Sequence, residues 1–88
     1  MNVVYVASEV FPFFKTGGLA DVMYSLPRKM SRIGHDVSVI MPKYSQISQI
    51  YTRKMEHVIS VEYSGRVFNI YKIVEGYVIY YFVENKEL

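Results

Sequence analysis

Two short apolar runs near the start of the chain enclose a stretch with helical spacing. The first run, Val3–Ala7, predicts a buried strand. Between about residues 17 and 33 the apolar positions recur every three or four residues, which predicts an amphipathic helix with one apolar face. These positions are Leu19, Val22, Met23, Leu26, Met30 and Ile33. Pro27 lacks a backbone N–H and is expected to kink or widen this helix, and Gly34 suits the left-handed residue that ends it.

The second apolar run, Val37–Met41, predicts another strand. Strand, helix and strand therefore fit within the first 41 residues as a right-handed parallel unit, half of a Rossmann-like sheet. Farther along, Ile47, Ile50, Tyr51 and Met55 have the spacing of a short amphipathic helix, which we expect within Ser45–Met55.

From about His57 onward the pattern becomes that of extended chain. We expect three strands, at 58–63, 66–74 and 77–83. The dipeptides Ser64-Gly65 and Glu75-Gly76 stand between them, where tight hairpin turns belong. Every residue of 77–83 is apolar or aromatic, which is typical of a strand covered on both faces. The predicted fold class is α/β: the N-terminal part of a Rossmann-like domain, with parallel strands, a crossover helix and a β-hairpin region.

Composition narrows the class of protein. At 88 residues the chain forms one domain at most, and 51% hydrophobic residues exclude a disordered protein. A net charge of +2 is too small to predict a nucleic-acid-binding surface. The chain has no cysteine, so disulfides and thiolate sites are excluded, and its two histidines lack metal-ligand spacing.

Targeting and membrane signals are missing as well. No apolar run reaches the roughly 18 residues of a membrane helix, and the N-terminus does not read as a signal peptide. A cytoplasmic protein with no membrane partner is the expectation.

The candidate chemistry lies in Lys15-Thr16-Gly17-Gly18, at the junction of the first strand and the helix. Thr16 is the expected N-cap residue. The start of a helix carries roughly half a positive charge, so a lysine beside it predicts a bound anion such as phosphate. Two glycines let a ligand approach the backbone. The dinucleotide-binding and P-loop glycine patterns are absent, and so is the hydroxyl-rich loop of a flavodoxin-like domain.

Residues 6–22 resemble the N-terminal signature of bacterial glycogen synthases and plant starch synthases. The resemblance continues through 26–27, 34–37 and 41–44, fades across 45–76 and returns weakly in 77–83. It implies a GT-B glycosyltransferase of two domains. Such enzymes transfer glucose from ADP-glucose to the non-reducing end of an α-1,4-glucan such as glycogen, with retention of configuration. No metal ion or other cofactor is implied.

The resemblance also implies roles for particular residues. Lys15 would contact the nucleotide sugar, and Gly17 and Gly18 would allow the close backbone approach beside it. Glu9 and Asp21 lie near the same strand end, where they would bond sugar hydroxyls of donor or acceptor. Each has a simpler interpretation: Lys15 as surface charge, Glu9 as a solvated loop acid, and Asp21 as a carboxylate that the helix dipole favours.

Members of this family are several times longer than 88 residues. The chain is therefore expected to be a partial N-terminal catalytic domain, without the second GT-B domain and without a catalytic residue of its own. We expect it to be inactive alone and to self-associate, because strand 77–83 would lack later sheet neighbours. The alternative is a short non-catalytic α/β module that binds a nucleotide sugar, a glucan or a protein partner through the Lys-Thr-Gly-Gly loop. An encoding gene that continues past Leu88 would favour the first hypothesis.

Overall fold

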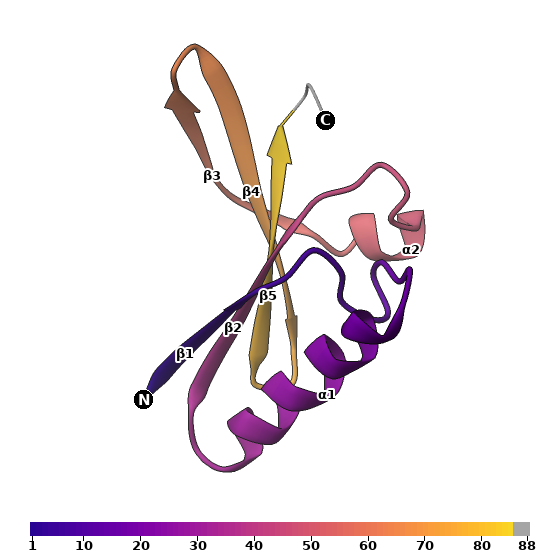
Figure 1. The fold of residues 1–88 in the computed structure, drawn as a ribbon. Helices are drawn as coiled ribbons and strands as arrows, with labels where there is room; N and C mark the ends of the chain where they lie inside the picture. The colour runs from indigo at the N-terminus through magenta and orange to yellow at the C-terminus, as the bar shows by residue number, and fades with distance from the viewer. Residues whose placement is uncertain (86–88) are drawn as a thin grey trace.

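The computed structural model describes residues 1–85, which form five strands and two helices (Figure 1). In chain order these are β1 (Asn2–Val6), α1 (Gly18–Arg32), β2 (Asp36–Pro42), α2 (Gln49–Thr52), β3 (Glu56–Tyr63), β4 (Arg66–Glu75) and β5 (Val78–Asn85). The first three elements lie close to the bounds that the hydrophobic pattern predicts. No helix within residues 1–85 has the length and apolar character needed to cross a bilayer.

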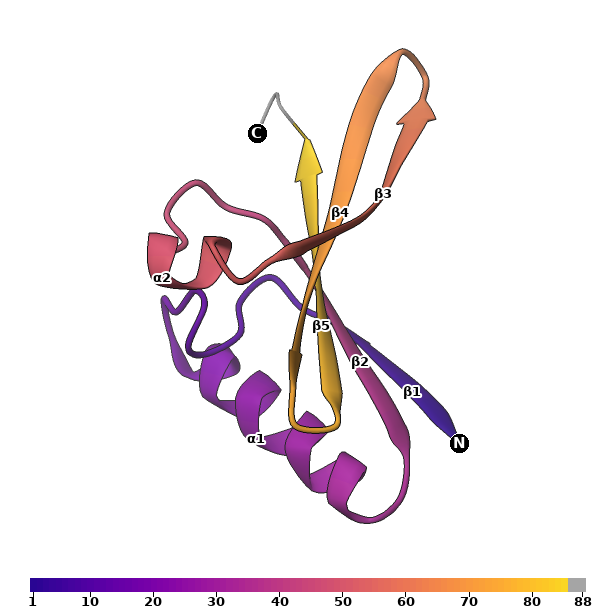
Figure 2. The ribbon, with the colours of Figure 1, turned by 180° about the vertical axis from the view of Figure 1, so that it is seen from behind.

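All five strands form one sheet, in the order β1-β2-β5-β4-β3. β1, β2 and β5 are parallel, and β4 and β3 are antiparallel to their neighbours. Both helices lie on the same face of the sheet, as the two opposite views show (Figures 1 and 2). The predicted mixture of a parallel β-α-β unit and a hairpin region is confirmed.

The core lies between α1, the loop that precedes it and one face of β2 and β5. Along β5, Val78, Tyr80 and Phe82 are buried, whereas the residues between them are only half-buried. Within the described residues the helices cover one face only (Figure 2), so the second face, which the apolar pattern of β5 predicts to be covered, is open here. The reason given for self-association is wrong, because β5 is paired on both sides, with β2 and β4.

Helix α1 packs on the sheet through only part of its apolar positions. Ala20 and Pro27 are buried, and Met23 and Met30 pack against the core. Four of the apolar positions with helical spacing are instead exposed: Leu19, Val22, Leu26 and Ile33. Apolar residues occupy two adjacent stripes of this helix, and only one of them can face a single sheet. The helix runs through Pro27 without a break, and Gly34, with φ +101°, ends it as predicted.

The second half of the chain departs further from the local pattern. α2 covers only Gln49–Thr52, not most of 45–55, and its N-terminus is capped by the Ser48 hydroxyl. The turn at Ser64-Gly65 is confirmed, since both residues have positive φ and Tyr63 pairs with Arg66. The second turn is Gly76-Tyr77, one residue later than predicted, because Glu75 still pairs with Val78.

Candidate functional site

The loop between β1 and α1 is fixed by the core beneath it. Ala7 donates its backbone N–H to the Ile40 carbonyl, and Val10 is fully buried. The Phe13 ring lies edge-on to the rings of Tyr80 and Phe82, with both centroid distances at 5.1 Å. Phe13 is itself buried and packs in the core. The loop is therefore a rigid support for the side chains that follow it.

Glu9 is the buried carboxylate of this loop, with only 6% of the residue exposed. Its Oε2 accepts hydrogen bonds from the Thr16 hydroxyl and from the Thr16 backbone N–H, the latter at 2.9 Å. Its Oε1 accepts the Ala20 N–H at 3.1 Å. The Thr16 hydroxyl and N–H bonds, followed by the backbone bonds from Ala20 and Gly17, lower the pKa of Glu9 against an opposing effect of burial. The interpretation of Glu9 as a solvated loop acid is wrong.

The N-cap prediction fails for the same reason. The N-cap residue of α1 is Gly17, in an extended conformation, and glycine has no side chain that could cap the helix. The Thr16 hydroxyl is committed to Glu9, so it does not accept an N–H of the first turn. The Glu9 carboxylate accepts the Ala20 N–H of the first turn, the kind of bond that we expected the Thr16 hydroxyl to accept.

Lys15 and Asp21 form an ion pair on the outer side of the same helix start. The distance between Lys15 Nζ and Asp21 Oδ2 is 2.8 Å, and the two side chains are 48% and 56% exposed. Asp21 lies in the first turn of α1, where the helix dipole favours a carboxylate. An exposed pair of this kind contributes little to stability, so Lys15 can exchange Asp21 for another anion at small cost.

Gly17 and Gly18 lie beside this ion pair and are both exposed. A Cβ atom on Gly17 would be 3.8 Å from Glu9 Oε1, and one on Gly18 would meet no atom within 4 Å. Packing within residues 1–85 therefore does not require glycine at position 18. The first N–H groups of a helix have no partner within it, and those of Gly18 and Leu19 bond no other described group. Together with the exposure of Gly18, these two N–H groups are open to solvent-side partners.

A second polar cluster adjoins the carboxyl end of β2, and the sequence reasoning did not find it. Lys43 Nζ lies 3.0 Å from Glu84 Oε2, and Asn69 Nδ2 donates to the other Glu84 oxygen at 3.2 Å. The Lys43 ammonium is the largest of the influences that hold the pKa of Glu84 below its usual value. Next to Lys43, Tyr44 donates its hydroxyl to the Ser8 carbonyl at 2.9 Å, which ties this segment to the β1–α1 loop. Pairing between positions 43 and 84 has no local sequence signal.

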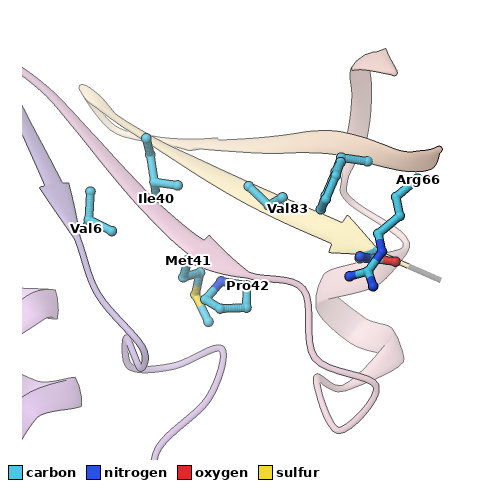
Figure 3. A pocket seen from close by; sticks show the side chains of 8 residues that line it. Val6, Ile40, Met41, Pro42, Arg66 and Val83 are labelled. Atoms are coloured by element: carbon cyan, nitrogen blue, oxygen red, sulfur yellow. The ribbon is translucent and has the colours of Figure 1, made fainter. Parts of the chain in front are cut away.

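An apolar hollow lies on the uncovered face of the sheet (Figure 3). Its lining comes from the ends of β1, β2 and β5 and from the start of β4: Val6, Ile40, Met41, Pro42, Arg66, Phe68, Val83 and Asn85. None of the residues with a predicted role lines it. Residues 1–85 also contain no group of three or more His, Asp or Glu side chains that could hold a metal ion.

Comparisons with known proteins agree with this geometry. The profile of the starch synthase catalytic domain matches residues 2–88. A glycogen synthase of Caldicellulosiruptor saccharolyticus is 47% identical over 91 residues, and one of Bacillus subtilis is 38% identical over 90 residues. Each alignment covers 98% of this chain but only 19% of the relative, so the chain spans about one fifth of their length.

A solved structure is similar as well. The catalytic domain of starch synthase IV from Arabidopsis thaliana, bound to ADP and acarbose, matches with a TM-score of 0.77 and 28% identity. The match covers 94% of this chain and 18% of that one. The resemblance seen in residues 6–22 and 41–44 thus extends to the whole sequence and to the fold, and the chain belongs to the starch synthase catalytic domain family.

Proposed function

We propose that this chain is the N-terminal part of a retaining GT-B glucosyltransferase that transfers glucose from ADP-glucose to the non-reducing end of an α-1,4-glucan, glycogen. Its glycogen synthase relatives support the reaction class. The starch synthase IV structure, bound to ADP and acarbose, supports a nucleotide and a glucan-like sugar as ligands. The cytoplasm, where nucleotide sugars and glycogen are both present, is the proposed location.

The observation that carries the donor site is the position of Lys15 beside the exposed backbone of Gly18. The ammonium group and the unbonded N–H groups of Gly18 and Leu19 offer positive charge and two hydrogen-bond donors at the start of the helix. A diphosphate would replace Asp21 as the partner of Lys15. As the bond to glucose breaks, negative charge develops on the departing ADP, and these fixed donors stabilise it.

Gly17 contributes to the donor site through its small size. Asp21, once released from Lys15, stays a candidate for bonds to sugar hydroxyls, whereas both oxygens of the buried Glu9 already accept hydrogen bonds from Thr16 and Ala20. In a two-domain GT-B enzyme all of these residues would supply one wall of the cleft between the domains, and transfer requires donor and acceptor to be held between two walls. The 88-residue chain alone is therefore expected to be inactive.

Changing Lys15 to Ala in the full-length enzyme that carries this sequence tests the proposal. We expect kcat/KM for ADP-glucose to fall by about 100-fold, the order found when one transition-state donor is removed. The exposed Lys54, whose side chain forms no hydrogen bond or ion pair within residues 1–85, offers a matched control in Lys54→Ala. Equal kinetics for wild type and Lys15→Ala would remove Lys15 from the donor site. A wild-type enzyme that transfers no glucose would overturn the proposed reaction itself.

A further inference from the structure

Glu9 differs from every other acidic residue within residues 1–85, because it alone is buried. Burial of a carboxylate is costly unless hydrogen bonds replace the lost water. Here they do: Thr16 and Ala20 supply three donors to its two oxygens. The donors lie on either side of Gly17 and Gly18, so one side chain holds both ends of the glycine pair.

We propose that Glu9 is a positioning residue, which holds the Lys15–Gly18 segment in the geometry that receives the phosphates of the donor. The inference rests on the proposed function and deepens it. Glu9 follows β1 by three residues and is anchored by its buried neighbour Val10, so it transmits the rigidity of the sheet to the loop. Lys15 directly precedes Thr16, the residue that Glu9 holds most closely.

The same carboxylate decides where an anion can bind. It already occupies the N–H of Ala20, in the first turn of α1, with a negative charge. A phosphate at that inner position would meet like charge and find a donor already used. The remaining donors are the unbonded N–H groups of Gly18 and Leu19 and the exposed Lys15 ammonium, which can exchange Asp21 for a phosphate, and the phosphates are therefore directed to these groups.

The chemistry of the three bonds explains why glutamate, and not glutamine, suits position 9. All three partners donate hydrogen, and a carboxylate accepts at both oxygens. Glutamine has almost the same shape but turns one accepting oxygen into an NH2 group, which would face a donor. Aspartate keeps the charge but is one methylene too short to reach Thr16 and Ala20 together.

The first arm of the test follows hydrogen exchange of the backbone amides at 16–20, in Glu9→Gln and in the control Glu62→Gln, whose side chain is exposed on β3. We expect exchange at Thr16 and Ala20 to become at least about tenfold faster in Glu9→Gln and to stay unchanged in the control. Unchanged exchange in Glu9→Gln would overturn the proposal. This arm needs no enzymatic activity.

The second arm measures kinetics in the full-length enzyme. Glu9→Gln should raise KM for ADP-glucose and lower kcat/KM for it by about 10- to 100-fold, while KM for the glucan stays constant. Simple loss of folded enzyme would lower kcat alone, without this split between the two substrates. Faster loop exchange with wild-type donor kinetics would overturn the positioning role and leave the proposed reaction intact.

A milder variant, Thr16→Val, removes only the hydroxyl donor. If Glu9→Gln does not fold, Thr16→Val alone should still raise KM for ADP-glucose, and a wild-type KM in that variant would overturn the proposal. Where both variants fold, they can also be combined. Because Thr16 acts through Glu9, the effects of Glu9→Gln and Thr16→Val on donor KM should be clearly less than additive. Additive effects would contradict the proposal. If the wild-type enzyme transfers no glucose, the proposed function fails, and the exchange arm still decides whether Glu9 holds the loop.

Discussion

Tyr80 offers a sharp test of the core, because its ring is well packed and its hydroxyl is not satisfied. The residue is 1% exposed, and its ring lies edge-on to Phe13. Its hydroxyl is buried and has no hydrogen-bond partner within residues 1–85. A buried polar group without a partner costs about 1–3 kcal/mol. Phenylalanine keeps the ring and removes that group, so Tyr80→Phe should stabilise the chain by about 1 kcal/mol or more.

The pKa of Tyr80 adds a second consequence of the same burial. Burial, helped by the charge of Glu75, raises this pKa from 10.0 to about 12. Above pH 10 the unfolded chain therefore loses its proton first. Stability of the wild type falls between pH 10 and 12, by up to about 3 kcal/mol for a difference of two pKa units. Tyr80→Phe lacks this loss, so its advantage over the wild type should grow with pH in that window.

Urea denaturation of the 88-residue chain, followed by circular dichroism at pH 7 and pH 11, measures both effects. Thermal unfolding at pH 7 gives a second readout, because in a domain of this size about 1 kcal/mol corresponds to a rise of roughly 4–8 °C in Tm. Tyr81→Phe is the matched control, since Tyr81 is next in β5, points to the opposite face and is only half-buried. We expect the control to change stability by less than about 0.5 kcal/mol. A Tyr80→Phe variant less stable than the wild type at pH 7 would refute the reasoning.

Three further predictions concern turn strain, acid stability and association. Gly34→Ala should destabilise the chain by about 1 kcal/mol, because a φ of +101° strains a residue with a Cβ atom, while no other atom lies within 4 Å of the added methyl group. Ser64→Gly, which places a glycine at another position of positive φ, is the control. A fall in the urea midpoint that is no larger for Gly34→Ala than for Ser64→Gly would contradict this prediction. The lowered pKa of Glu84 makes its share of stability complete above pH 4.5 and lost as pH falls through the pKa of the folded state, so acid unfolding of Glu84→Gln should depend less steeply on pH. The exposed apolar stripe of α1 predicts that the isolated chain self-associates, and sedimentation should show less association in Leu26→Gln; a monodisperse wild-type monomer at high concentration would argue against it.

Local patterns along the chain were enough to predict most of the elements of the fold. The spacing of apolar residues predicts β1, α1 and β2. The helix end at Gly34 and the turn at Ser64-Gly65 could be predicted because glycine readily adopts positive φ. The motif at 6–22 was enough to indicate the family. These features depend on neighbours within a few residues, so the order of the residues already contains them.

The pairing of side chains from distant positions could not be predicted in this way. The spacing of α1 shows that it is amphipathic, but whether Leu26 or Pro27 faces the sheet depends on how the helix is rotated against β2 and β5. Thr16 has the local chemistry of an N-cap residue, yet in the folded loop its hydroxyl donates a hydrogen bond to the Glu9 carboxylate instead. Lys43 and Glu84 meet only because β2 and β5 are neighbours in the sheet. Such contacts form between segments that the chain keeps far apart, and only packing brings them within bonding distance.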